Sequence, residues 1–137
     1  MPGYWLLKSE PAVYSFDELV KDKTTVWDGV SSNAALKHMR AMKKGDRAFF
    51  YHSGDEKAVV GLTEITAAAY PDPKLKDERM VVIEVAAKEK LKNPVPLARI
   101  KGDPAFAQFA LVRISRLSVM PVDPTLWERI LKMSEKQ

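Results

Sequence analysis

The residues best suited to chemistry lie in residues 45–54, a stretch bounded by glycines in which an aromatic run ends at Tyr51 and is followed by His52 and Ser53. Aromatic runs bounded by glycine predict a buried strand. Side chains alternate along a strand, so Tyr51 and Ser53 should share one face and His52 the other. Two interpretations remain open: a core strand that reaches the surface, or a strand that opens into a binding pocket with a polar rim.

Residue types give little support for catalysis or metal binding. The chain has two histidines and no cysteine, which excludes disulfides, thiolate zinc sites and cysteine nucleophiles. His52 and Ser53 are neighbours on the expected strand and therefore point apart, unlike a base–nucleophile pair. The glycines are scattered, so no phosphate-binding loop is indicated. We expect no metal, no cofactor and no enzymatic activity.

Binding has better support, because three aromatic residues stand directly before turn-forming or polar sequences: Trp27, Tyr51 and Tyr70. An aromatic ring at the mouth of a pocket is a platform for a planar base, and such stacking is worth about 1–3 kcal/mol. For Trp27 and Tyr51, simple burial in the core is the competing interpretation.

The positive charge is concentrated in two segments. Residues 31–47 and residues 86–101 each carry five Lys or Arg residues against one acidic residue, although the whole chain has a formal net charge of only +4. Basic segments on an otherwise acidic chain indicate a surface that faces a polyanion. Ordinary solvated faces are the alternative on charge alone.

Length and composition predict one globular domain over residues 1–137. The chain has 137 residues, of which 46% are hydrophobic, enough to bury a core. The beginning of the chain lacks the basic and apolar regions of a signal peptide, and no stretch approaches the roughly 20 apolar residues of a membrane span. We expect a cytoplasmic protein without a membrane partner. A monomer is the expected oligomeric state, and a dimer is the alternative.

The first half of the chain predicts strands alternating with short helices. Strands are expected over residues 4–8 and 24–27. A helix should begin at the capping box formed by Ser15 and Glu18. A second helix over residues 33–42 should begin at Ser31 or Ser32 and end with Gly45 as its C-cap, before the aromatic strand.

The second half predicts further strands over residues 58–66, 80–87 and 116–120. Gly61 indicates a bulge in the first of these strands, and the Tyr70-Pro71 sequence should end it. Residues 93–96 read as a loop, and single helical turns are expected over residues 96–100 and 104–110. A last helix should begin at Asp123-Pro124. Bent strands with short helices between them suggest an α+β fold built on a small mixed β-barrel.

Several blocks of sequence, in this order, resemble the EVE domain family. The resemblance extends from about Tyr4 to Trp127. The blocks are Tyr4-Trp5-Leu6-Leu7-Lys8-Ser9-Glu10-Pro11, Val26-Trp27-Asp28-Gly29-Val30, Met42-Lys43-Lys44-Gly45-Asp46, Tyr51-His52-Ser53, Tyr70-Pro71-Asp72-Pro73 and Arg116-Leu117-Ser118-Val119.

The resemblance implies a PUA-like fold, a small mixed β-barrel flanked by short helices and related to the YTH and ASCH domains. It also implies recognition of a modified base, such as a methylated or oxidised cytosine, in DNA or RNA. Trp27 would be the wall on which the base stacks. The residues that the resemblance places around the base are Lys8, Ser9, Trp27, Asp28, Gly29, Val30, Tyr51, His52, Ser53, Arg116, Leu117 and Ser118.

The chain departs from the family pattern after Val30. Family members usually have Arg-Asn followed by an aromatic residue there, whereas this chain has Ser31-Ser32-Asn33-Ala34. The missing arginine removes one contact to a phosphate or a base. The basic residues that could replace it as phosphate contacts are Lys37, Arg40, Lys43 and Lys44.

Two other functions stay open at this point. In a nucleobase- or nucleotide-processing enzyme, His52 would act as acid or base. In a protein-interaction subunit, Trp127 and the last helix would form the docking face. The residues do not select one modification, nor DNA over RNA.

Overall fold

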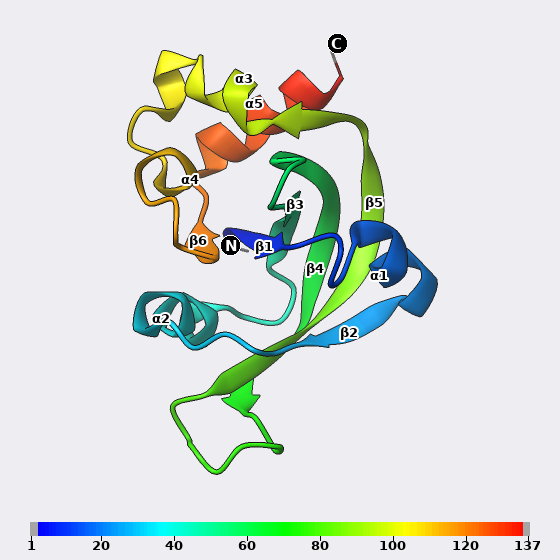
Figure 1. Cartoon of the computed structure of the whole chain (residues 1–137), viewed down its shortest axis with the longest axis vertical. Coiled ribbons are helices and arrows are strands. Elements are labelled where there is room, and N and C mark those ends of the chain that lie inside the picture. The colour runs from blue at the N-terminus through cyan, green and yellow to red at the C-terminus, as the bar shows by residue number, and fades with distance from the viewer. Residues whose placement is uncertain (1–2, 136–137) are drawn as a thin grey trace.

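A computed structural model describes residues 3–135 as an α+β fold around one mixed sheet of six strands (Figure 1). The expected domain of residues 1–137 includes residues 1–2 and 136–137, which lie outside the described residues. The strands are β1 (Tyr4–Ser9), β2 (Thr24–Trp27), β3 (Arg47–His52), β4 (Ala58–Pro71), β5 (Val81–Pro96) and β6 (Val119–Pro121). The helices are α1 (Phe16–Asp22), α2 (Asn33–Ala41), α3 (Leu97–Lys101), α4 (Ala110–Arg113) and α5 (Pro124–Ser134), together with the 3-10 turn η1 (Pro104–Phe106).

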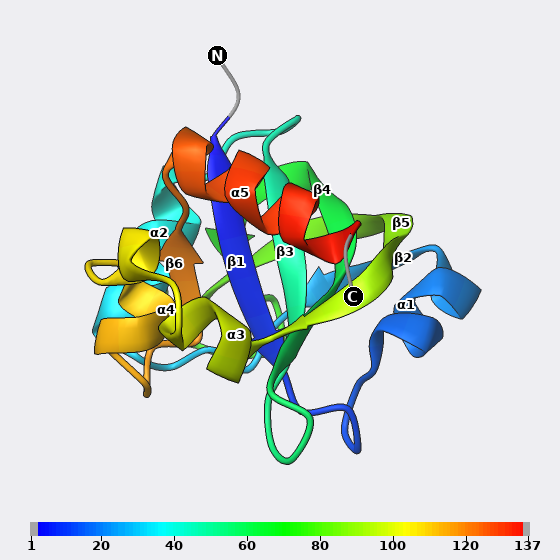
Figure 2. The ribbon, with the colours of Figure 1, turned by 90° about the horizontal axis from the view of Figure 1, so that it is seen from above.

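The strand order is β2-β5-β4-β3-β1-β6. Only β1 and β3 pair in parallel, which places Lys8 opposite Tyr51 and Ser9 opposite His52. The other neighbours are antiparallel. The C-terminal helix α5 lies across β1 and β3 (Figure 2), where the Trp127 ring stacks 3.9 Å from Phe49 and 4.5 Å from Tyr4 between ring centroids.

The sheet bends strongly but does not close, so the predicted closed barrel is not confirmed. The Trp27 ring on β2 meets the Phe50 ring on β3 at 5.5 Å between centroids, although two strands separate β2 from β3 in the sheet. The end strands β2 and β6 have four and three residues, and they are not paired with each other. An open seam therefore remains between them.

Gly61 allows the bend to occur. As expected, the register between β3 and β4 shifts between Phe50 and Tyr51, opposite Gly61. A Cβ atom on Gly61 would overlap the ring of Phe16, which is fully buried and packs edge-on against Phe50 at 5.3 Å. The absence of a side chain thus lets helix α1 seat its first residue directly on the sheet.

Local signals predicted the helix starts correctly. Ser15 accepts a hydrogen bond from the Glu18 amide, and the Glu18 side chain accepts one from the Ser15 amide, so the capping box is complete. Ser32 caps α2 and Asp123 caps α5. The predicted end of α2 was wrong, because the helix ends at Ala41 and residues 42–46 form a separate turn.

The buried carboxylate of Asp46 holds that turn. It accepts hydrogen bonds from the amides of Gly3 and Lys43 and from the indole nitrogen of Trp5, at 2.8–2.9 Å. Burial on its own would raise the pKa of the Asp46 carboxyl, but the three donors outweigh it and hold that pKa below its usual range. Asp46 therefore ties the start of β1 to the start of β3.

One of the two expected breaks at proline was wrong. Strand β4 runs beyond the expected residues 58–66 but does end at Tyr70-Pro71, whereas the predicted loop at residues 93–96 is the end of strand β5. Both stretches have one free edge, because β3 pairs with β4 only as far as Glu64 and β2 pairs with β5 only over residues 83–86. A proline costs no ladder hydrogen bond when its missing N–H faces a free edge.

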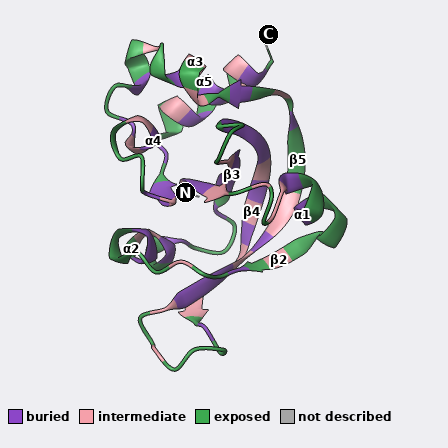
Figure 3. Cartoon of the chain, in the orientation of Figure 1, coloured by how far each residue is buried: buried purple, intermediate pink, exposed green. Residues whose placement is uncertain are grey.

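The remaining differences are small. The expected turn over residues 104–110 is divided into η1 and α4, and the last strand begins at Val119, after Arg116 and Leu117. Buried residues are concentrated in β1, β3 and the first halves of β4 and β5 (Figure 3). None of the helices within residues 3–135 has the length and apolar character needed to cross a membrane.

Candidate functional site

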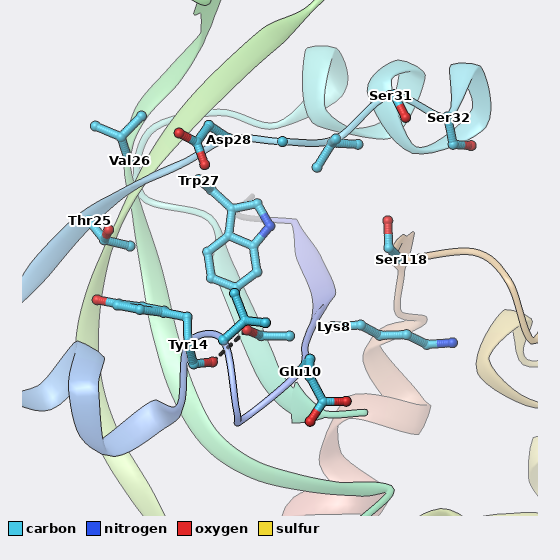
Figure 4. Close-up of a pocket in the computed structure, with 14 residues that line it drawn as sticks. Lys8, Glu10, Tyr14, Thr25, Val26, Trp27, Asp28, Ser31, Ser32 and Ser118 are labelled. Atoms are coloured by element: carbon cyan, nitrogen blue, oxygen red, sulfur yellow. Dashed lines mark hydrogen bonds between the residues drawn. The ribbon is translucent and has the colours of Figure 1, made fainter. Parts of the chain in front are cut away.

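A cavity of about 580 Å³ lies at the open seam of the sheet, and we call it the Trp27 cavity (Figure 4). It lies among the end of β1, the end of β2 and the residue that precedes β6. Its volume is in the range of about 300–1,000 Å³ that is typical of small-molecule sites. The lining residues are Lys8, Ser9, Glu10, Val13, Tyr14, Thr25, Val26, Trp27, Asp28, Gly29, Val30, Ser31, Ser32 and Ser118.

Trp27 forms the aromatic wall of this cavity. It is the last residue of β2, and the turn that follows needs Gly29 because its φ is +76°. Phe50 supports the indole edge-to-face from the core, with a 90° angle between the rings. Only 9% of Trp27 is exposed, and Figure 4 shows the indole in the middle of the side chains that line the cavity. The ring is therefore held rigidly and offers a small, fixed apolar surface.

The loop between β1 and α1 builds the wall next to Trp27. Ser9 Oγ donates a hydrogen bond to the Tyr14 carbonyl oxygen at 2.5 Å, which closes the loop on the end of β1. The Tyr14 hydroxyl donates to Asp22 Oδ2 at 2.8 Å, and burial together with this bond raises the pKa of Tyr14. The same loop carries Val13, which lines the cavity and is 78% exposed.

The charged residues that line the Trp27 cavity are two acids and one lysine. Glu10 and Asp28 are exposed hydrogen-bond acceptors, and Lys8 is half-buried. Burial lowers the pKa of Lys8. The cavity therefore combines an apolar wall with acceptors that suit an amino group on a flat ring.

The structure brings together seven of the twelve residues predicted around the base. Tyr51 and Ser53 line a different, smaller cavity. His52, Arg116 and Leu117 line neither of these two cavities. The seven that line the Trp27 cavity are Lys8, Ser9, Trp27, Asp28, Gly29, Val30 and Ser118.

His52 holds the start of helix α1. Its Nε2 accepts a hydrogen bond from the Phe16 amide at 3.0 Å, and its Nδ1 lies 2.7 Å from Glu56 Oε1. Because Nε2 is an acceptor, Nδ1 carries the proton and donates it to the Glu56 carboxylate. Both ring nitrogens are occupied within the fold, so the expected rim of hydroxyl and imidazole facing Trp27 is not formed.

The predicted phosphate contacts lie on or just after helix α2, outside the Trp27 cavity. All four are exposed, and Arg40 donates to the carbonyl oxygen of Arg79 in the loop between β4 and β5. They are Lys37, Arg40, Lys43 and Lys44, and their role stays a prediction.

Seven residues of the cavity were missed by the sequence analysis. Two of these, Glu10 and Val26, belong to blocks that carry the family resemblance and could have been included on that ground. Thr25 lies on strand β2, and the other four come from loops or the cap of α2, whose position depends on the tertiary fold. The missed residues are Glu10, Val13, Tyr14, Thr25, Val26, Ser31 and Ser32.

The fold and the cavity define a class: an α+β domain with an aromatic-walled cavity at the open seam of its six-stranded sheet. An ASCH protein from Zymomonas mobilis shares this fold, with a TM-score of 0.60 at 10% identity over 96% of this chain and 95% of its own. The EVE domain family model matches residues 3–133. The chain belongs to the EVE domain family.

Relatives of known structure cover nearly the whole chain. A protein from Rhodopseudomonas palustris is 44% identical with a TM-score of 0.93, covering 97% of this chain and 93% of its own. Human THYN1 protein, in complex with 5-methylcytosine containing DNA, is 31% identical with a TM-score of 0.88, covering 98% and 99%. Human thymocyte nuclear protein 1 is 30% identical in an alignment of 172 positions, which covers 100% of this chain and 76% of that protein.

Proposed function

We propose that this chain is a nucleic-acid-binding module that holds a modified base, such as a methylated or oxidised cytosine, in the Trp27 cavity. The observation that supports this most is a cavity of about 580 Å³ with an indole wall and acidic acceptors at its rim. A relative with 31% identity and the same fold is the human THYN1 protein, in complex with 5-methylcytosine containing DNA. DNA is therefore the first partner to test, and RNA the second.

The cavity suits a base that has left its stack. Turning a base out of a strand costs a few kcal/mol, and packing its ring against Trp27 returns about 1–3 kcal/mol. The exocyclic amino group of cytosine is a donor, for which the Asp28 or Glu10 carboxylate is an acceptor.

A methyl group on the base would contribute by apolar burial. Val13 and Val26 line the cavity and are 78% and 45% exposed, so they have apolar surface left to cover. Burying one methyl group is worth about 1 kcal/mol, which corresponds to a preference of about fivefold. Removing the apolar surface that Val13 or Val26 offers to the methyl group should lower this preference.

The two other functions have less support. In the enzyme hypothesis His52 would exchange a proton with a substrate, yet both of its nitrogens are engaged by Phe16 and Glu56. In the interaction hypothesis Trp127 would be a docking residue, yet it is 3% exposed and stacks on Phe49. A binding module without catalysis is the proposal that agrees with these contacts.

The test measures the anisotropy of labelled single-stranded oligonucleotides that contain one cytosine or one 5-methylcytosine. We expect the methylated strand to bind about fivefold tighter to the wild type at low salt. Trp27→Leu should raise the Kd by about 5- to 150-fold, the loss of about 1–3 kcal/mol of stacking, and should remove the preference. An RNA strand with the same base is titrated in parallel.

Trp127→Leu is the matched control, because it removes an indole that packs in the core and lines none of the cavities. It should lower the thermal stability while leaving the preference for the methylated strand unchanged. Equal binding of methylated, oxidised and unmodified strands by the wild type would defeat the proposal.

A further inference from the structure

A second cavity, of about 270 Å³, adjoins the Trp27 cavity, and we call it the lysine cavity. Three lysines from distant parts of the chain line it: Lys8 at the end of β1, Lys57 in the hairpin between β3 and β4, and Lys101 at the end of α3. Tyr51 and Ser53 supply hydrogen-bonding groups beside them. The fold thus brings three lysine residues to one hollow.

No negative charge within the cavity balances these lysines. None of its lining residues is acidic, and the ion pairs formed within residues 3–135 involve other basic residues. The exposed Glu10 carboxylate lies against Gly54 at the edge of the lysine cavity, but Glu10 itself lines the Trp27 cavity. Unpaired like charges held near one another repel, so this arrangement favours a bound anion.

The backbone holds Lys57 in an unusual conformation. Its φ is +48°, a left-handed conformation that lysine rarely adopts. Its carbonyl oxygen accepts a hydrogen bond from the Leu97 amide at 2.7 Å, which attaches the hairpin to the start of α3. The same contact brings Lys57 and Lys101 to one cavity. Glycine or asparagine would be less strained at this position. The fold therefore keeps a lysine here in spite of the backbone strain.

Lys8 belongs to both cavities. Its Nζ donates to the Ser115 carbonyl oxygen at 2.9 Å and lies 5.7 Å from the centre of the Tyr51 ring. Both Ser115 and Tyr51 line the lysine cavity and not the Trp27 cavity. The ammonium is therefore fixed on the lysine-cavity side, while the residue still forms part of the other wall.

The Trp27 cavity itself is poorly suited to a phosphate, because Glu10 and Asp28 outnumber Lys8 among its charged lining residues. A strand whose base enters that cavity must place its phosphates elsewhere. We propose that the lysine cavity binds a phosphodiester group of the same strand, next to the nucleotide whose base lies against Trp27. This inference rests on the proposed function.

The test uses the single variants Lys57→Gln and Lys101→Gln and their combination. Lys8 is left unchanged because it also lines the Trp27 cavity. The Kd for a single strand with 5-methylcytosine is measured between about 50 and 200 mM salt. Each phosphate contact adds about 0.7 to the salt slope of a single strand. We expect the double variant to lower the slope by about 0.7, the share of one phosphate, and to keep the preference for the methylated base.

A neutral linkage locates the phosphate. Methylphosphonate replaces each phosphodiester in turn on either side of the modified base. One replacement should weaken binding to the wild type about 5- to 10-fold and have no effect on the double variant. The matched control is Lys132→Gln, because Lys132 is an exposed lysine on α5 that lines neither the Trp27 cavity nor the lysine cavity. This variant should respond to the replacements as the wild type does.

Two results would overturn the inference. One is a double variant with the same salt slope and the same methylphosphonate profile as Lys132→Gln. The other is that inorganic phosphate shifts the NMR signals of the lysine side chains in the cavity, while the salt slope for the strand is the same in the wild type and the double variant. That result would assign the cavity to a small anion. If the wild type itself showed no preference for the modified base, that result would instead count against the proposed function.

Discussion

Replacing Gly61 with alanine sets two effects of opposite sign against each other. The backbone of Gly61 is not left-handed, because the positive φ values among the described glycines belong to residues 29, 45 and 54. Alanine restricts the unfolded chain more than glycine does, and at a compatible site this stabilises a protein by about 0.4–1 kcal/mol. The new Cβ would, however, overlap three ring atoms of Phe16.

The steric effect should win. Phe16 is 1% exposed, and its ring packs on Phe50 at 5.3 Å between centroids, so it cannot swing into solvent. Overpacking of a filled core costs about 1–3 kcal/mol. After the entropic gain is subtracted, we expect Gly61→Ala to lower the free energy of unfolding by about 1–2 kcal/mol. This corresponds to a fall in Tm of about 4–8 °C for a domain of this size.

Urea denaturation followed by circular dichroism measures the change, which should appear in the midpoint and not in the slope. Gly102→Ala is the matched control. A Cβ there would meet its nearest atom, the Ala98 carbonyl oxygen, at 3.5 Å, an ordinary contact, and φ is −75°. The control should be neutral or slightly stabilising.

A double variant identifies the clash. Phe16→Leu shortens the side chain that blocks the new Cβ. Combined with Gly61→Ala, it should cost at least about 1 kcal/mol less than the sum of the two single changes, as expected for residues in contact. A Gly61→Ala protein as stable as the wild type, or single effects that simply add, would refute this account of why the residue is glycine.

Three further changes have defined outcomes. Asp46→Asn should lower the free energy of unfolding by about 2–3 kcal/mol at neutral pH. Because the pKa of Asp46 is held below its usual range, the wild type should lose this contribution as the pH falls below about 4. Equal loss of stability in acid by both proteins would contradict this role of Asp46. Ser15→Ala should cost about 1 kcal/mol in urea denaturation through loss of the cap on α1, and Ser31→Ala, which caps no helix, should not. Trp127→Ala should lower stability by about 3–5 kcal/mol without changing the mass measured by light scattering, because Trp127 stacks on Phe49 inside the molecule.

Helix starts were readable from the sequence because their signals are local. Ser15, Ser32 and Asp123 each cap the helix that follows them within three residues. The strand over residues 47–52 and the bulge at Gly61 were equally clear, since aromatic runs and an isolated glycine need no distant partner to be recognised. The family resemblance added seven of the residues that line the Trp27 cavity.

Contacts between distant residues determined the rest. Pro71 and Pro94 lie within strands because those parts of β4 and β5 have a free edge, and the free edges follow from which strands pair. The His52 imidazole reaches the Phe16 amide because the Phe16 ring packs on Phe50 of β3, which brings the start of α1 to the end of that strand. Neither result can be inferred from the neighbours of a residue in sequence.

The sequence by itself determined the elements, the family and the aromatic residue at the end of β2. Only the tertiary structure determined the two cavities. The sheet bends without closing, which leaves the seam that Trp27 lines. The parallel pairing of β1 with β3 places Lys8 beside Tyr51, and the contact between Lys57 and Leu97 brings in Lys101. Charges that are 44 to 93 residues apart in sequence can meet only when the folded backbone holds them together.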